Sequence, residues 1–125
     1  TNPQEASEAS VLIVDRIGIL NQVYPLAQMA YVGGGFKTGL HNTLEAAVYG
    51  IPLAIGPNFN KFKEAKDLVA LGGIQVINTT ENATQFLELA VEKPYIEQIK
   101  GIQTSYISAQ LGATFKIMSQ IAKYF

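Results

Sequence analysis

The sequence has no cysteine and few charges of either sign. Without cysteine, disulfide bonds, thiolate catalysis and zinc–thiolate sites are excluded, and a reducing cytoplasmic compartment is compatible with the chain. Charged residues make up only 15% of the chain, and the net charge is −1. A nucleic-acid-binding protein usually carries a basic stripe, so we expect no nucleic-acid partner. A short lysine cluster (Lys61, Lys63, Lys66) is more typical of a solvated helix face.

Long apolar runs and clusters of metal ligands are also missing from the sequence. No apolar run approaches the ~20 residues of a membrane-spanning helix, and no signal-peptide pattern is present. With a single histidine, His41, we expect no metal ion and no cofactor. The 125 residues fit one domain. Because the chain starts Thr1-Asn2-Pro3 and not with methionine, we interpret residues 1–125 as one domain excised from a longer protein.

Short apolar runs alternate with helical patterns along the chain. The apolar runs predict buried parallel strands, because they are continuously apolar and flanked by Gly, Asp or Asn; they lie at residues 11–14, 30–32, 52–55 and 74–77. Helices are predicted at residues 20–28, 42–49, 61–71 and 81–91. Gly50 and Gly72 are expected to cap two of these helices at their C-terminal ends. The alternating order predicts an α/β fold with a doubly wound parallel sheet.

The tail from Pro94 onward is helical in pattern. Two apolar stripes have the spacing of three and four residues that marks one helix face: Ile96, Ile99, Ile102 and Tyr106, then Ala113, Ile117, Ile121 and Tyr124. We expect both stripes to contact the core, so that the tail packs back on the domain. Gly101 and Gly112 are candidates to kink or divide it.

The loop after Val32 has the composition of a phosphate-binding loop. Ligands of open α/β sheets bind beyond the carboxyl ends of the strands. Three consecutive glycines, Gly33–Gly35, remove Cβ atoms and let backbone N–H groups approach a ligand oxygen. The helix predicted to begin near Asn42 would add free N–H groups and a partial positive charge. Neither the Walker pattern nor the dinucleotide fingerprint fits this loop.

Asn42, Glu45 and His41 each have two interpretations. Asn-x-x-Glu at a helix start is close to a capping box, in which Asn42 is the cap and Glu45 is its partner. Alternatively, the Glu45 carboxylate accepts hydrogen bonds from vicinal ribose hydroxyls. His41, at the mouth of the glycine loop, is as compatible with a ligand contact as with a structural role.

Two further loops are expected at the same edge of the sheet. Gly56-Pro57 forms a turn after one strand, and Asn60 is a candidate cap of the helix that carries Glu64. The earliest loop contains Arg16, the only arginine, which could contact a phosphate or carboxylate or simply be solvated. We expect these loops to lie beside the glycine loop.

These motifs together resemble the C-terminal domain of the 3-deoxy-D-manno-octulosonic acid (Kdo) transferases, which are glycosyltransferases with two Rossmann-like domains (GT-B). The resemblance spans about residues 11–125 and rests on these segments: Asp15-x-x-Gly18-x-Leu20, Tyr31-Val32-Gly33-Gly34, His41-Asn42-x-Leu44-Glu45, Gly50-x-Pro52, Gly56-Pro57, Asn60-x-Phe62-x-Glu64 and Gly112-Ala113-Thr114. The His-Asn-x-x-Glu block with its preceding glycines, together with the later Gly-Pro, is fairly specific.

The resemblance implies an enzyme that transfers Kdo from CMP-Kdo to a lipid A precursor, in lipopolysaccharide biosynthesis. The reaction takes place at the cytoplasmic face of the bacterial inner membrane and needs no metal. In this family the C-terminal domain binds the donor nucleotide. The catalytic base, the acceptor surface and the membrane contact belong to an N-terminal domain, absent here, so we expect no catalytic residue in this chain and no transfer by it alone.

The resemblance also implies a donor site. By position, it carries over Gly33, Gly34, His41, Asn42 and Glu45, with Gly56, Pro57, Asn60 and Glu64 beside them. The loop arguments add Gly35, Arg16 and Gly18. One departure is Ile19, where family members often carry an acidic residue. Two alternatives stay open: a GT-B domain for another donor, such as a UDP-hexosamine, and a non-catalytic, flavodoxin-like nucleotide-binding module.

Overall fold

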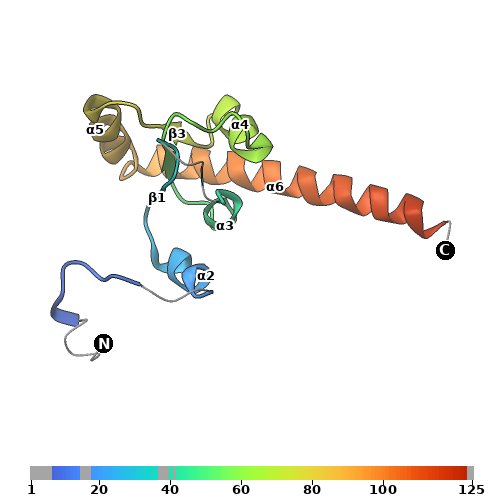
Figure 1. Ribbon diagram of the computed structural model, residues 1–125, viewed down its shortest axis with the longest axis horizontal. Coiled ribbons are helices and arrows are strands. Elements are labelled where there is room, and N and C mark those ends of the chain that lie inside the picture. Colours follow the sequence, from blue (N-terminus) through green and yellow to red (C-terminus); the bar gives the residue numbers. More distant parts are fainter. Residues whose placement is uncertain (1–6, 15–17, 37–39, 41, 124–125) are drawn as a thin grey trace.

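The computed structural model describes residues 7–14, 18–36, 40 and 42–123. Figure 1 shows a small α/β body with a long helix that lies behind it and extends beyond it. The elements are, in chain order, α2 (Leu20–Val23), the 3₁₀ helix η1 (Tyr24–Leu26), β1 (Ala30–Val32), α3 (Leu44–Ala47), β2 (Leu53–Ile55), α4 (Lys63–Ala70), β3 (Gln75–Val76), α5 (Thr80–Leu89) and α6 (Lys93–Ala122). No described helix has the length and apolarity needed to cross a membrane.

The three strands form a parallel sheet in the order β1-β2-β3. Alternate side chains of the central strand face opposite layers, as the pleat requires. Leu53 and Ile55 join the core formed with α3, α4 and α6, whereas Ala54 packs against Phe86 and Ala90 at α5. Helices therefore cover both faces of the sheet, and the predicted α/β class is confirmed.

The prediction of a buried strand at residues 11–14 is wrong. This segment forms no strand, and all four of its side chains are exposed. In Figure 1 it lies apart from the three strands, in the blue part of the chain. A strand exists only through hydrogen bonds to a neighbour, and within the described residues β1 pairs with β2 alone. Apolar composition therefore did not suffice to place this run in the sheet.

The predicted helix at residues 20–28 is shorter and more irregular than expected. The α-helical part, α2, has only 4 residues. The 3₁₀ helix η1 follows, with Pro25 in its first turn. Proline lacks the N–H that an α-helical hydrogen bond requires, so it is tolerated only in the first turn of a helix. The glycine caps are confirmed, since Gly50 and Gly72 adopt φ angles of +65° and +82° after α3 and α4.

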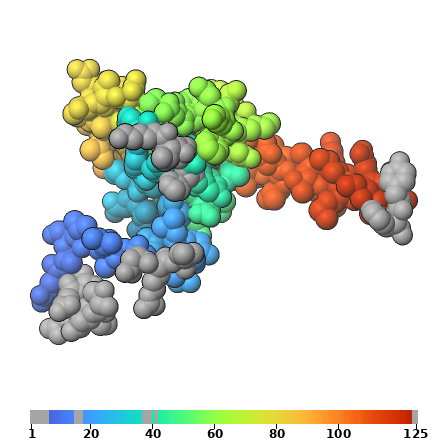
Figure 2. All heavy atoms as spheres, viewed as in Figure 1, coloured from blue at the N-terminus to red at the C-terminus, as the bar shows by residue number. Residues whose placement is uncertain are grey.

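Helix α6 is a single helix of 30 residues, so neither Gly101 nor Gly112 divides it. Each glycine costs about 1 kcal/mol relative to alanine, which a long cooperative helix tolerates. The first apolar stripe contacts the body as expected, with Ile99 fully buried. The second does not, because Ile117 and Ile121 are 58% and 49% exposed. Figure 2 shows this C-terminal half projecting into solvent. Tyr124 lies outside the described residues.

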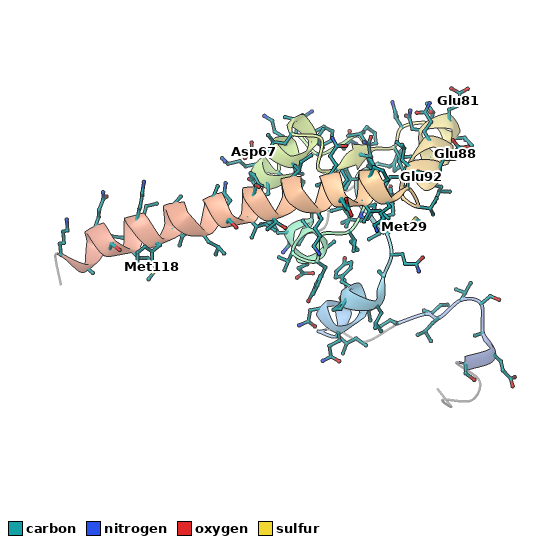
Figure 3. All side chains as sticks on the ribbon, turned by 180° about the vertical axis from the view of Figure 1, so that it is seen from behind. Met29, Asp67, Glu81, Glu88, Glu92 and Met118 are labelled. Carbon is teal, nitrogen blue, oxygen red and sulfur yellow. The ribbon has the colours of Figure 1, made fainter. Side chains whose placement is uncertain are left out.

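Two polar contacts fasten the first half of α6 to the body. The buried Gln103 side chain donates from Nε2 to the carbonyl oxygens of Ile51 and Gly73, at 3.0 Å each. The Tyr106 hydroxyl donates to Asp67 Oδ2 at 2.8 Å, which links α6 to α4. Figure 3 labels Asp67 at the place where these two helices lie side by side. Lys63 also donates to Asp67, at 2.9 Å.

Candidate functional site

The loops after β1 and β2 lie against each other at the carboxyl edge of the sheet. The backbone N–H of Asn58 donates to the carbonyl oxygen of Gly35 at 2.7 Å. The Asn58 side chain donates from Nδ2 to the carbonyl oxygen of Phe36 at 3.0 Å. The two strands are parallel neighbours, so their carboxyl ends meet. The predicted proximity of the glycine loop and the Gly56-Pro57 turn is therefore confirmed.

Each of the three glycines of the loop occupies its position for a different physical reason. A Cβ on Gly35 would lie 2.7 Å from the backbone of Gly56, and one on Gly56 would lie 2.8 Å from the backbone of Gly35. These two glycines are needed so that the loops can touch. Gly34 has φ of +92°, a conformation that favours glycine. At Gly33 an added Cβ would meet no described atom within 4 Å, so this glycine leaves open space beside the backbone.

The N-cap residue of α3 is Thr43, with no side-chain capping hydrogen bond, so the capping-box interpretation of Asn42 and Glu45 is wrong. The Asn42 Oδ1 atom accepts a hydrogen bond from the Leu44 N–H at 3.0 Å. Among the described residues, no hydrogen bond involves the Glu45 side chain, which is exposed. The carboxylate is therefore available to a ligand. Because α3 has only 4 residues, its dipole adds little, and backbone N–H groups are the stronger basis for anion binding.

A cavity of about 670 Å³ lies between α2 and α3. It brings Gly18 and Glu45, two residues predicted for the donor site, into one lining. The described lining residues are Val14, Gly18, Leu20, Asn21, Glu45, Val48 and Tyr49. Its volume lies within the range of about 300–1,000 Å³ that is usual for small-molecule sites. Three of its side chains are apolar, and the others carry an amide, a carboxylate and a phenol.

Two tyrosines hold α2 and η1 against α3 beside this cavity. The Tyr49 hydroxyl donates to the main-chain carbonyl oxygen of Asn21 at 2.8 Å. The rings of Tyr24 and Tyr49 stack with centroids 6.2 Å apart. Partial burial raises the pKa of the Tyr24 hydroxyl, and the negative charge of Glu45 adds to the increase. The Glu45 carboxylate thus acts electrostatically on the Tyr24 hydroxyl.

A second cavity, of about 340 Å³, lies at the start of α3. It brings Asn42 and Glu64 together with apolar side chains that include Leu40 and Phe62. Glu64 belongs to the first turn of α4. The predicted role of Asn60 as the cap of α4 is wrong, because Phe62 is the N-cap residue and no side chain caps this helix. The chain turns between Phe59 and Phe62, whose N–H donates to the Phe59 carbonyl oxygen, so α4 starts after Asn60.

The structure thus brings the predicted site residues together in three places. Gly33, Gly34, Gly35, Gly56 and Pro57 form the paired loops; Gly18 and Glu45 line the larger cavity; Asn42 and Glu64 line the smaller one. Arg16 and His41 lie outside the described residues. Sequence reasoning missed Asn21, Tyr49 and Asn58, because their contacts cross between loops and helices. Among the described residues, no group of three or more His, Cys, Asp or Glu side chains could hold a metal ion.

Comparison with known proteins identifies several relatives, although no model of a known protein family matches the chain. The chain is 40% identical over 96 residues to the 3-deoxy-D-manno-octulosonic acid transferase of Aquifex aeolicus, covering 74% of this chain and 27% of that protein. It is 33% identical over 91 residues to the enzyme of Chlamydophila psittaci, covering 70% and 21%. It is 29% identical over 114 residues to that of Bordetella pertussis, covering 89% and 27%.

A solved structure has the same fold. The C-terminal CMP-Kdo binding domain of WaaA from Acinetobacter baumannii superposes with a TM-score of 0.66 at 23% identity, covering 75% of this chain and 51% of that one. The chain spans only about a quarter of the length of the first relatives above. It belongs to the family of 3-deoxy-D-manno-octulosonic acid transferases and has the fold of their C-terminal domain.

Proposed function

We propose that this chain is the donor-binding domain of a glycosyltransferase that moves Kdo from CMP-Kdo to a lipid A precursor. The observation that carries the proposal is the larger cavity, which Gly18 and the exposed Glu45 carboxylate line. The open backbone at Gly33, in the loop after β1, is the second feature on which it rests. A nucleoside monophosphate presents a vicinal diol and one phosphate, which these groups can bind. The relatives are Kdo transferases, and the structural neighbour binds CMP-Kdo.

In this arrangement the cytidine occupies the larger cavity, and its ribose hydroxyls donate to Glu45. The single phosphate lies at the backbone of Gly33 and Gly34. The Kdo unit extends towards the smaller cavity, which Asn42 and Glu64 line. No metal is required, because the N–H groups of the loop neutralise part of the phosphate charge.

The remaining parts of the reaction belong to another domain. A general base has to activate the acceptor hydroxyl, and we assign it, with the acceptor surface and the membrane contact, to an N-terminal domain. Residues 1–125 then form the nucleotide-sugar-binding domain and have no catalytic residue of their own. The full enzyme would work at the inner face of the bacterial inner membrane, on the cytoplasmic side.

Titration of the chain with CMP tests the donor site. We expect the amide resonances of Gly33, Gly34 and Leu44 to shift with CMP and much less with cytidine, which lacks the phosphate. Shifts confined to the α4 lysines would mean that CMP binds by charge attraction alone, and this would contradict the proposal. If UDP-N-acetylglucosamine shifted the same resonances at a lower concentration than CMP, the result would favour a UDP-hexosamine donor instead.

A variant pair tests the role of Glu45. Hydrogen bonds to a charged group contribute about 1.5–3 kcal/mol, so Glu45→Gln should weaken CMP by about tenfold or more. The same variant should weaken 2′-deoxy-CMP much less, since that ligand lacks one of the two hydroxyls. Glu88→Gln, at an exposed carboxylate on α5, is the matched control and should leave both affinities unchanged. Equal losses for both ligands would show that Glu45 does not bind the ribose.

A further inference from the structure

The larger cavity contains one polar side chain for which the ribose and phosphate leave no role. We propose that Asn21 reads the edge of the nucleobase and that Tyr49 positions it. The proposal rests on the function proposed above and adds to it the residue that recognises the base. It follows from the hydrogen-bonding capacity of the three polar side chains in the described lining: Asn21, Glu45 and Tyr49.

Two of these three side chains cannot both donate to and accept from the edge of a base. The Tyr49 hydroxyl already donates its only proton to the Asn21 main-chain carbonyl oxygen, at 2.8 Å. The Glu45 carboxylate can only accept, which suits a diol. The Asn21 amide offers both a donor and an acceptor. Among the described residues, no hydrogen bond uses that amide, which is exposed at the cavity.

The chemistry of cytosine matches this amide. Its Watson–Crick edge presents an acceptor, N3, next to a donor, the N4 amino group, so a side-chain amide can form two hydrogen bonds with it. The flat ring also needs apolar surface. Val14, Leu20 and Val48 supply it, because they line the same cavity and are exposed to it. The cavity therefore combines an amide for the edge of the base with aliphatic side chains for its faces.

Tyr49 fixes where the Asn21 amide lies. Helix α2 has no buried residue, so packing by itself holds it weakly. The hydrogen bond from Tyr49 binds the main chain of Asn21 itself. The stacking of Tyr49 on Tyr24 holds η1, the next element, against the same helix. Tyr49 is therefore a positioning residue that joins both elements to α3, on which Glu45 lies.

The test compares two ligands that differ only by the base. In the full chain we expect Asn21→Ala to weaken CMP by about tenfold, as the loss of two neutral hydrogen bonds implies. Ribose 5-phosphate, which has no base, should bind the variant and the unchanged protein equally. Gln22→Ala removes an exposed amide that lies outside the described lining of the cavity. It is the matched control and should change neither affinity.

Tyr49→Phe keeps the ring and removes only the hydroxyl. We expect it to weaken CMP by a few fold and to leave ribose 5-phosphate unchanged, which a general loss of stability would not do. The melting temperature of each variant is measured alongside to confirm folding. Unchanged CMP affinity in Asn21→Ala would overturn the assignment of Asn21 while leaving the donor site in place. Failure of the unchanged chain to bind CMP would overturn the proposed function itself.

Discussion

Residues 11–14 and strand β2 have nearly the same composition and opposite environments. Both are short aliphatic runs, yet Ile13 is 84% exposed and Ile55 is 0% exposed. Strand β2 has a parallel neighbour on each side and helices on both faces. The other run has no strand partner within the described residues. The difference teaches that an apolar run favours burial, whereas its neighbours decide whether it is buried.

The glycine turns that follow the two runs differ in the same way. Gly56, after β2, lies in backbone contact with Gly35, so any side chain there would clash. Gly18, after the exposed run, has φ of +90°, and an added Cβ would meet no described atom within 4 Å. One glycine is needed because of a neighbouring segment, and the other because of its own backbone conformation.

One of the two largest expected effects is a loss of stability on truncating a side chain of β2, compared with the same change in residues 11–14. Ile55→Ala should lower the free energy of unfolding by about 2–5 kcal/mol, because it removes buried methyl groups and leaves a cavity. The same change at Ile13 should alter it by less than about 0.5 kcal/mol. Urea unfolding followed by circular dichroism measures both. Similar losses at the two sites would mean that the run at residues 11–14 is buried in solution.

A second substitution removes the polar contacts to the segments just before β2 and β3. Gln103→Ala leaves the carbonyl oxygens of Ile51 and Gly73 without this donor. Each buried unsatisfied group costs about 1–3 kcal/mol, so we expect a loss of about 2–6 kcal/mol for the two. Gln98→Ala, at an exposed position of the same helix, is the control. If both variants unfold at the same urea concentration, Gln103 does not hold α6 to the sheet.

A third pair of substitutions separates packing from ligand space at the paired loops. Gly56→Ala should cost about 1–3 kcal/mol, since the new methyl group would have to displace the backbone of Gly35. Gly33→Ala should leave stability within about 0.5 kcal/mol, but it should weaken CMP because its methyl group enters the space assigned to the phosphate. Thermal unfolding and CMP titration of both variants provide the measurements. Intact CMP binding in Gly33→Ala would contradict that placement.

The smallest effect concerns alkaline pH. Burial raises the pKa of Tyr106 to about 12, and the hydrogen bond to Asp67 and the negative charges of Asp67 and Glu64 add to the increase. The folded state therefore holds this proton more tightly than the unfolded state, whose tyrosine has a pKa near 10.0. The stabilisation is complete below that value and is lost as the pH rises towards 12. The melting temperature should fall across this window.

Tyr106→Phe should reduce the alkaline decrease of the melting temperature, because the variant has no such proton to lose. Tyr31→Phe, at an exposed tyrosine of β1, should retain the decrease of the unchanged protein. Melting curves at about pH 9 and about pH 11 are sufficient. An identical decrease in all three proteins would place the alkaline effect elsewhere in the chain.

Much of the fold could be predicted from the sequence because its signals are local. The runs at β1 and β2 are apolar and flanked by glycine, and Gly50 and Gly72 end their helices with the expected positive φ angles. The helical period of the tail also predicted α6. Its uninterrupted course and its exposed C-terminal half could not be predicted, because an apolar stripe indicates a face but not what covers it.

For the site, the sequence alone determined the glycine loop, the Asn-x-x-Glu block and the family. These depend on residue type and short spacing, which a linear chain displays directly. Only the tertiary structure decided that Thr43 is the N-cap of α3 and that Glu45 makes no hydrogen bond within the described residues. Only it placed Gly35 and Gly56 in backbone contact. Only it joined Tyr49 to Asn21, 28 residues earlier in the chain. Contacts between distant segments depend on how helices and loops pack around the sheet. The spacing of residues along the chain does not specify that packing.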